Sequence, residues 1–455
     1  MKYRLLTSGN ERRLLLIFAG WGMDDAPLRE LTPHAGYDLA VAWDYRDLNL
    51  PDFTNGYDEI CVVAWSFGVA AAQHWMTANR HLPVTRRTAV GGTLYPVDDT
   101  LGIPVAIFRG TLDSLSSENL TRFYRRMTGS GAAYREFAKS LPKRDIEELA
   151  DELRAIYALP PVHENAVMEW DEVYILTDDR IIPPQNQRNA WTGHPAIIEL
   201  QSAHLPDFSA IIPRAAMCKA TVKQRFAAGS ATYDESAGVQ NRITALMTEM
   251  WLKHGKPGAD GNIVEIGTGT GQLTRRYAPL CSSCLSMTSV DLTEPSPALP
   301  GRKIACDGEL FVRSLPDASV DILFTASTIQ WFNSPREFLR QCARILPAGG
   351  TVLLSTFGPD NYREIRSIAS SLPRYMSASH VRALLPEELV IEESHEELCT
   401  LEFDTTAELL HHIRQTGVNI TEASPDKALG AALALARSGI NRLTYNPVIL
   451  MLRRR

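Results

Sequence analysis

The sequence lacks long apolar runs, an excess of positive charge and a cysteine framework, and each absence excludes a class of protein. No apolar stretch approaches the roughly 20 residues that a membrane-spanning helix needs, so we expect no membrane partner. The formal net charge of −7 argues against binding to nucleic acid, because phosphate neutralisation requires a basic surface. The seven cysteines are scattered and odd in number, which favours a reducing compartment and therefore a cytoplasmic protein.

Two short patterns mimic functional signals without their full set of residues. Cys281 and Cys284 form the only CxxC pair, and no second pair or histidines at ligand spacing accompany it, so we predict no metal site. The N-terminus places basic side chains before an apolar run, but the run is short, is flanked by Glu11 and lacks a cleavage site of small residues. We therefore expect a first strand there and not a signal peptide.

The chain is long enough for two or three domains, and its apolar runs indicate the α/β class in both halves. Continuous β-rich runs without polar alternation predict strands buried on both faces, hence parallel sheets covered by helices. The runs are LLLIFAG, LAVAW, EICVVAW and VAIFRG in the first half, and NIVEIG, CLSMTSVD, VDILFTAS and TVLLSTF in the second. Periodicity weakens over 206–222, so we place the boundary near residue 218, with domains at 1–213 and 223–455 and a linker at 214–222.

The stretch AWSFGV, residues 64–69, predicts a sharp turn between a strand and a helix that exposes one hydroxyl. A small residue, then serine two positions later and glycine two positions after that, following a strand, is the pattern of the nucleophile elbow of α/β-hydrolases. Ala64 replaces the usual glycine, but the crowded turn demands only a small side chain there. Ser66 is therefore the candidate nucleophile.

The partners of Ser66 are expected in the chain order of that fold, first an acid and then a histidine. The β-rich run EVYIL leads into a pair of aspartates, of which we choose Asp179 as the acid. His204 follows the next apolar run in AIIELQSAHLPDF, so it is the predicted base. His163 is the rival base and Asp113 the rival acid, but both lie too early in the strand order to be preferred.

An acyl-transfer site also needs hydrogen-bond donors for the developing oxyanion. These are commonly the amide after the nucleophile and one amide from a loop after an early strand. The stretch IFAGWGMD supplies that loop, where Gly20 and Gly22 allow a tight turn beside the substrate. We assign the two donors to the N–H groups of Trp21 and Phe67.

Several motifs of the first half together resemble the short α/β-hydrolases of the BioG type, which are pimeloyl-acyl carrier protein methyl ester esterases. The resemblance spans residues 1 to about 213 and rests on LLLIFAGWGMD, AWSFGV, GIPVAIFRGTLDSLSSENLTRFYRRM, DDRIIPPQNQRNAW and AHLPDF. It implies that Ser66 and His204 carry out ester hydrolysis. Asp179 matches the family's Asp-Arg-Ile-x-Pro stretch less distinctively.

The second half contains a glycine-rich loop, IVEIGTGTGQLT, that follows a predicted strand and opens a predicted helix. Its GxGxG spacing differs from the GxGxxG of dinucleotide-binding folds, so no pyrophosphate is implied. Glu265 places a carboxylate for a cationic amino group, Asp291 can accept both hydroxyls of a ribose, and Asp307 can contact an adenine amino group. The set resembles the Rossmann-like class I S-adenosylmethionine (SAM)-dependent methyltransferases, and its glycines are Gly267, Gly269 and Gly271.

Flanking motifs narrow this second resemblance to BioC, the malonyl-acyl carrier protein O-methyltransferase of biotin synthesis, over residues 219–455. The motifs are RFAAGSATYDESAGVQ, ASTIQWFNSPREFLRQCARILPAGGTVLLSTFGPDNYREI and LLHHIRQTGVN. The resemblance implies SAM as the cofactor and malonyl-acyl carrier protein as the methyl acceptor.

Methyl transfer from a sulfonium to a carboxylate is a direct displacement by a group that is already ionised. It therefore needs desolvation and alignment more than a strong base. We predict a substrate pocket with Tyr233, Gln330 and Trp331 near the methyl donor. An arginine should hold the carboxylate, and Arg363 and Arg374 are the candidates.

Both resemblances together imply a bifunctional enzyme of biotin synthesis. Methylation of malonyl-acyl carrier protein hides the free carboxylate during chain elongation, and the esterase removes the methyl group at the pimeloyl stage. Because the carrier is acidic, basic faces should dock it. Arg122, Arg125 and Arg126 lie at i, i+3 and i+4 of a predicted helix near the esterase site, so we predict that they form such a face.

Two other functions stay open at the level of sequence. In the first, both halves act on free small carboxylic acids and their esters, without a carrier protein. In the second, the hydrolase half is a non-catalytic module that holds the acylated carrier for the methyltransferase. The presence of Ser66, Asp179 and His204 together argues against the second alternative.

Overall fold

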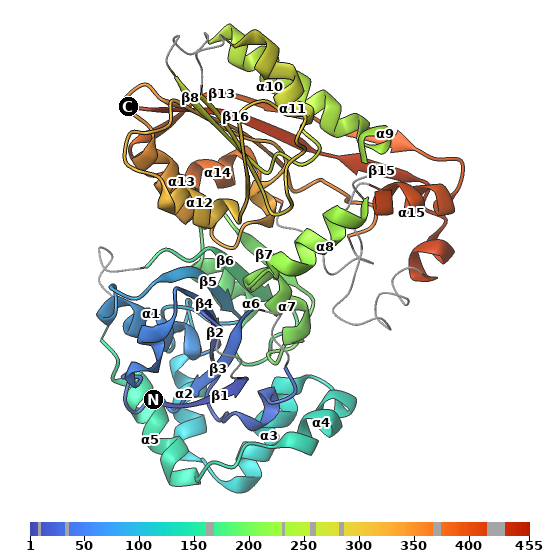
Figure 1. Cartoon of the computed structure of the whole chain (residues 1–455). Coiled ribbons are helices and arrows are strands. Elements are labelled where there is room, and N and C mark those ends of the chain that lie inside the picture. Colours follow the sequence, from blue (N-terminus) through green and yellow to red (C-terminus); the bar gives the residue numbers. More distant parts are fainter. Residues whose placement is uncertain are drawn as a thin grey trace. The chain divides into compact units, whose positions relative to one another are not determined.

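The computed structural model divides the chain into two compact units, Met1–Ala216 and Met217–Arg455 (Figure 1). The structure describes residues 1–7, 11–31, 36–160, 168–229, 233–254, 261–281, 286–366, 375–415 and 433–455. The division falls inside the segment expected as a linker. That segment is partly helical, because α7 (Phe208–Ala215) ends in it and α8 (Lys219–Gly229) begins in it.

Within its described residues, the first unit is built on a seven-stranded sheet in the order β1-β3-β2-β4-β5-β6-β7. All neighbouring strands run parallel except β1, which pairs antiparallel with β3. The predicted parallel sheet is therefore confirmed apart from this edge strand. The strands are β1 (Lys2–Thr7), β2 (Arg13–Phe18), β3 (Asp38–Trp43), β4 (Glu59–Trp65), β5 (Val84–Val90), β6 (Glu172–Leu176) and β7 (Ile197–Leu200).

Strands β3 and β4 of this sheet are buried along their whole length, as expected of strands covered on both faces. Helix α1 (Gly68–Ala78) packs on β2, β4 and β5, and α7 packs on β4 and β5. Helix α6 (Pro184–Ala190) packs beside β6. Because β2, β4, β5 and β6 run parallel, the carboxyl ends of β2, β4 and β6 lie along one edge of the sheet.

A run of four helices between β5 and β6, here called the helical segment (residues 105–157), corrects one prediction. The run VAIFRG, expected as a strand, begins helix α2. Helix α2 starts after Pro104 and buries only Phe108, so these apolar side chains do not enter the sheet. The helices are α2 (Val105–Asp113), α3 (Ser117–Thr128), α4 (Gly131–Phe137) and α5 (Ile146–Tyr157).

The described part of the second unit holds another seven-stranded sheet, in the order β10-β9-β8-β11-β12-β16-β13. Its first five strands run parallel, and β16 is antiparallel to both of its neighbours, so the predicted parallel sheet is confirmed for that first part. The strands are β8 (Asn262–Ile266), β9 (Ser286–Asp291), β10 (Arg302–Ala305), β11 (Ile322–Thr325), β12 (Thr351–Phe357), β13 (Leu389–Glu396) and β16 (Pro447–Arg454), with β14 (Cys399–Glu402) and β15 (Arg442–Tyr445) in a separate pair.

Alternate side chains of this sheet enter two separate hydrophobic cores. Ile263 joins the core formed with α10, α11 and α15, whereas Val264 joins the core formed with α12, α13 and α14. Each face of the sheet is thus covered by its own helices, which explains the continuous apolar runs in the sequence. The helices are α9 (Tyr233–Ser236), α10 (Gly238–Lys253), α11 (Gln272–Tyr277), α12 (Gly308–Ser314), α13 (Pro335–Ile345), α14 (Ala378–Leu384) and α15 (Thr406–Gln415).

Across the stretches of chain that the structure describes, no helix combines the length and the apolar character needed to cross a lipid bilayer.

Candidate active sites

Ser66 occupies the turn between β4 and α1 in a backbone conformation that few non-glycine residues adopt. Its φ is +59°, in the left-handed region that a nucleophile elbow requires. The turn is crowded, because a Cβ on Gly68 would lie 2.4 Å from the carbonyl oxygen of Phe18 on β2. Glycine at position 68 therefore allows α1 to start close to β2, and the serine side chain is held above the sheet.

Ser66, His204 and Asp179 form a continuous hydrogen-bonded chain. The Nε2 atom of His204 lies 2.9 Å from Ser66 Oγ, and its Nδ1 atom lies 2.7 Å from Asp179 Oδ2. All three residues are buried. The histidine loop is fixed by Trp65, whose indole N–H donates to the carbonyl oxygen of His204 at 2.8 Å. This arrangement can take a proton from the serine hydroxyl and orient the imidazole for that task.

The structure distinguishes Asp179 from the other acids considered. Its Oδ1 atom accepts hydrogen bonds from the amides of Ile181 (2.7 Å) and Ile182 (3.0 Å), and its Oδ2 atom accepts one from Gln187 Nε2 (2.9 Å). These donors hold the carboxylate toward the histidine. Asp178, its neighbour, is exposed, and so is the rival acid Asp113 at the end of α2, while the rival base His163 lies outside the described residues.

The amides assigned to the oxyanion hole border the serine. Trp21 and Phe67 line a small cavity of about 30 Å³ together with Ser66. Among the described residues, neither amide donates a hydrogen bond to a protein acceptor, so both can serve a ligand. The remaining walls come mainly from apolar side chains, including Ile107, Phe108, Phe123, Leu153 and Ile181.

The three arginines predicted to dock the carrier lie on one helix, α3, but in different surroundings. Arg122 pairs with Glu118 at 2.6 Å, and Arg125 lies over the ring of Tyr134. Arg126 borders the small cavity beside Ser66. Only Arg126 of the three therefore contributes to the wall of the serine site.

In the second unit, the glycine-rich loop connects β8 to α11. Gly267, Gly269 and Gly271 have φ values of +74°, +54° and +87°, which L-residues with side chains rarely adopt. A Cβ on Gly267 would lie 2.0 Å from Thr328 Oγ1, so the backbone there passes directly against the loop after β11. The first two glycines border a cavity of about 550 Å³, and Gly271 does not.

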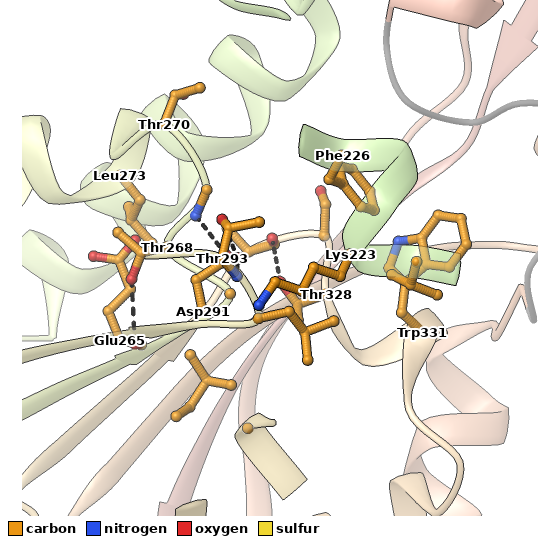
Figure 2. Close-up of a pocket in the computed structure, with 18 of the residues that line it drawn as sticks. Lys223, Phe226, Glu265, Thr268, Thr270, Leu273, Asp291, Thr293, Thr328 and Trp331 are labelled. Carbon is orange, nitrogen blue, oxygen red and sulfur yellow. Dashed lines mark hydrogen bonds between the residues drawn. The ribbon is translucent and has the colours of Figure 1, made fainter. Parts of the chain in front are cut away.

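Glu265 lies at the end of β8 on the wall of this cavity (Figure 2). Burial raises the pKa of this carboxyl to about 7, although hydrogen bonds from Thr274 (2.6 Å) and Tyr277 act in the opposite direction. A buried carboxyl that is only partly ionised near neutral pH gains most from a cationic partner. Glu265 therefore favours a ligand with a positive charge.

The two aspartates predicted to bind a nucleoside lie at the ends of neighbouring strands and line the same cavity. Asp291, at the end of β9, accepts hydrogen bonds from the amides of Gly269 and Thr293, each at 2.9 Å. Asp307 follows β10 and caps α12 by accepting a bond from the amide of Glu309 at 3.0 Å. Asp291 thus ties the glycine loop to the second strand of the site.

The predicted substrate residues differ in whether they line the cavity. Trp331 lines the cavity, whereas Gln330 is buried, bonds to the carbonyl oxygen of Ser327 and is not among the lining residues. Tyr233 begins α9, but its side chain lies outside the described part. Arg363 is exposed beside Glu364 and does not line the cavity. Arg374 lies outside the described residues.

Helix α8 supplies wall residues that the sequence analysis missed. Lys219, Lys223 and Phe226 line the cavity at i, i+4 and i+7, so the signal was a helical period of three to four residues. Phe226 lies edge-on to Trp331, with ring centroids 5.4 Å apart, and Figure 2 draws this pair at the end of the cavity away from Glu265. The α8 face therefore forms one side of the cavity.

Lys219 is part of a buried ion pair at the adenine-binding end predicted from Asp307. Its ammonium lies 2.7 Å from Glu309 and 3.7 Å from Asp307, and donates to the carbonyl oxygen of Trp331. Burial alone would raise the pKa of Glu309, but the charge of Lys219 and backbone hydrogen bonds outweigh burial and lower it. This pair fixes the start of α8 against the strand ends.

Within the described residues, no group of three or more histidine, cysteine, aspartate or glutamate side chains could hold a metal ion. Cys281 is a free thiol, and its CxxC partner Cys284 lies outside those residues.

Comparison with known families assigns each unit a relative. Residues 1–212 match the family described as pimeloyl-ACP methyl esterase BioG, and residues 264–354 match a methyltransferase domain. The chain is 36% identical over 430 residues to a protein of Bacteroides fragilis named malonyl-(acyl-carrier protein) O-methyltransferase, covering 90% of this chain and 85% of that protein.

Two further relatives each cover one half. A protein of the same name from Bacteroides thetaiotaomicron is 31% identical over 215 residues, covering 45% of this chain and 79% of that protein. The crystal structure of BioG from Haemophilus influenzae is 33% identical, with a TM-score of 0.42, and covers 45% of this chain and 94% of that structure.

Proposed function

This chain belongs to the family of malonyl-(acyl-carrier protein) O-methyltransferases and carries a BioG domain before its methyltransferase domain, and we propose that it catalyses two opposed reactions on one substrate series. The methyltransferase domain, residues 223–455, methylates the free carboxylate of malonyl-acyl carrier protein with SAM. The N-terminal domain, residues 1–213, is an α/β-hydrolase that cleaves the methyl ester of pimeloyl-acyl carrier protein.

One observation carries the esterase proposal, namely the hydrogen-bonded chain from Ser66 through His204 to Asp179. In the proposed reaction, Ser66 Oγ attacks the ester carbonyl while His204 Nε2 accepts its proton. The N–H groups of Trp21 and Phe67 stabilise the oxyanion. His204 then donates the proton to the departing methoxide oxygen, which leaves as methanol, and the acyl group stays on Ser66 Oγ. A water molecule that gives its proton to the same nitrogen hydrolyses this acyl-enzyme and releases the free carboxylate.

The second cavity fits SAM by its own features. Its volume of about 550 Å³ lies in the range of small-molecule sites, and its glycine loop leaves room for a ligand against the backbone. Glu265 is suited to an ammonium group, Asp291 to the ribose hydroxyls and Asp307 to the adenine amino group. SAM, when bound, supplies an electrophilic methyl group.

The chain's own task in methyl transfer is to align and desolvate the acceptor. The carboxylate is ionised at neutral pH, so no group in the cavity has to remove a proton from it. Phe226 and Trp331 provide an apolar wall that excludes water from the reacting oxygen. Tyr233 remains a proposed neighbour of the acceptor, and so does Gln330, although it does not line the cavity.

The two activities are suited to protect the carboxylate of a carrier-bound acyl chain as a methyl ester and later to restore it. Methylation removes the charge of the malonyl carboxylate, and ester hydrolysis restores a carboxylate after the chain has grown. Because one activity reverses the other, the esterase should hydrolyse the malonyl methyl ester much more slowly than the pimeloyl methyl ester. Comparable rates for the two esters would contradict this order of steps.

The proposal is tested with the full chain carrying Ser66→Ala, which cannot hydrolyse an ester that it makes. Malonyl-acyl carrier protein and SAM should yield a carrier that is heavier by one methylene group in mass spectrometry. The matched control, Ser66→Ala combined with Asp291→Ala, should gain the methylene group more slowly when SAM is limiting. Wild-type protein, but not Ser66→Ala, should then remove the methyl group from pimeloyl-acyl carrier protein methyl ester.

The alternatives give different results in the same experiment. If free malonate is methylated as fast as the carrier-bound form, both halves act on small acids. If Ser66→Ala leaves hydrolysis unchanged, the first unit is a non-catalytic module that holds the carrier. Cytoplasmic location and the absence of nucleic-acid and membrane partners remain part of the proposal.

A further inference from the structure

The loop after β2, residues 19–24, carries the proposed oxyanion donor and is here called the oxyanion loop. Gly20 and Gly22 lie in it, and Gly22 has a φ of +80°, so the loop's own sequence leaves its backbone many conformations. Three of its carbonyl oxygens accept hydrogen bonds from distant side chains: Ala19 from Tyr45, Gly22 from Tyr124 (2.9 Å) and Met23 from Arg144 (3.0 Å).

Most of these contacts come from the helical segment, more than a hundred positions later in the chain. Besides Tyr124 and Arg144, the amide of Lys143 donates to Asp24 Oδ2 at 2.7 Å. The side chain of Trp21 donates in return to the carbonyl oxygen of Leu149 on α5, at 3.0 Å. The helical segment and the oxyanion loop are thus joined by hydrogen bonds in both directions.

Arg144 is itself held by a buried charge network. Its guanidinium lies 3.1 Å from Glu152 and 3.5 Å from Asp44, and all three side chains are almost fully buried. Burial alone would raise the pKa of Asp44, but a hydrogen bond from Arg46 and the charge of Arg144 lower it to about 2. Asp44 is therefore ionised at neutral pH and keeps the network charged.

We propose that Tyr124 is a positioning residue of the esterase, which holds the oxyanion loop so that the N–H of Trp21 faces the reacting carbonyl. The inference rests on the proposed esterase function. Tyr124 lies on α3, two positions before Arg126, and Arg126 and Trp21 border the same cavity. The helix whose arginines are predicted to dock the carrier would therefore also support the oxyanion hole.

The variant Tyr124→Phe tests this role with little disturbance of packing. The tyrosine ring packs edge-on against Phe137, with centroids 5.2 Å apart, and phenylalanine keeps that contact while removing the donor to Gly22. With p-nitrophenyl butyrate as substrate, kcat should fall about tenfold and KM should stay within about twofold, because one supporting hydrogen bond is lost. Affinity for a trifluoromethyl ketone, whose adduct with Ser66 carries an oxyanion, should fall by a similar factor.

Two matched variants separate positioning from packing. Tyr134→Phe, on neighbouring α4, should change neither kcat nor inhibitor affinity. Ser117→Ala, at an exposed position at the start of α3 itself, should likewise change neither quantity. A kcat for Tyr124→Phe within twofold of wild type, or a rise in KM without weaker inhibitor binding, would overturn the inference. Wild-type protein without Ser66-dependent hydrolysis would instead refute the proposed esterase function.

Discussion

The two sites of this molecule differ in how much of the chemistry the protein itself supplies. In the first unit, the proposed nucleophile, base and acid already contact one another at 2.9 and 2.7 Å, and the adjoining cavity is only about 30 Å³. In the second unit, a cavity of about 550 Å³ is lined by glycines, carboxylates and apolar rings, and no such relay is proposed there.

This difference follows from the two kinds of reaction. Hydrolysis by a serine needs a protein nucleophile, which must be activated by hydrogen bonds that exist before the substrate arrives. Methyl transfer to an ionised carboxylate needs a bound donor and a shaped, dry space. Activity at the first site should therefore be lost when a single hydrogen-bonding atom of the Ser-His-Asp set is removed. The second site should lose cofactor affinity gradually as its contacts are removed.

The largest effect is expected at the acid of the serine site. Asp179→Asn should lower kcat for ester hydrolysis by about 10⁴-fold, because an amide cannot hold the imidazole tautomer that accepts the serine proton. Methyl transfer should be unchanged. The exposed neighbour supplies the control, since Asp178→Asn should keep nearly full activity in steady-state assays. Equal losses for both variants would remove Asp179 from the relay.

A smaller effect is expected in the methyltransferase site. Asp291→Ala removes the proposed ribose contact and the acceptor for the amide of Gly269. Affinity for S-adenosylhomocysteine, measured by calorimetry, should fall about 10- to 100-fold, which corresponds to charge-assisted hydrogen bonds of about 1.5–3 kcal/mol. The exposed Asp317→Asn is the control, and ester hydrolysis should not respond to either change. A loss above 10⁴-fold would erase the contrast between the sites.

The pKa of Glu265 predicts a pH dependence of cofactor binding. With a pKa of about 7, raised chiefly by burial, Glu265 is mostly neutral at pH 6 and mostly ionised at pH 8. Only the carboxylate attracts an ammonium group, so cofactor affinity should rise about tenfold over this interval. The variant Glu265→Gln should bind weakly at both values. A flat profile for wild type would show that Glu265 does not meet a cation.

The smallest effect is expected on α3. Arg126→Ala should raise KM for carrier-bound ester about two- to fivefold, as exposed charge pairs contribute little, and this effect should weaken with added salt. Arg125→Ala, which removes a side chain stacked on Tyr134, should act less strongly. If Arg125→Ala has the larger effect on KM, carrier docking is centred away from the cavity.

Local patterns predicted those elements of the fold whose structure depends on a single stretch of the sequence. The buried runs EICVVAW and NIVEI are strands, and the three glycines after β8 have positive φ values. The run VAIFRG was misassigned because an apolar stretch of six residues suits a strand or a helix equally. Only the tertiary structure, in which Phe108 of α2 is buried and contacts Phe67 and Tyr157, distinguishes them.

The missed wall of the second cavity has a similar cause. Lys219, Lys223 and Phe226 share one face of α8. Two lysines and a phenylalanine at helical spacing do not by themselves indicate a ligand site. Gln330 and Trp331 are adjacent in sequence, yet only Trp331 reaches the cavity. Which of two neighbouring side chains faces a site depends on the backbone of the turn, and the sequence motif contains both.

The sequence by itself determined the α/β class, the order of nucleophile, acid and base, and the position of the glycine loop, because these depend on periodicity and chain order. The tertiary structure decided which aspartate meets His204, which arginine borders the serine, and how the oxyanion loop is held. Those choices depend on contacts between residues far apart in the chain, such as Tyr124 and Gly22. No local pattern encodes them, since they form only when the helical segment packs beside the sheet.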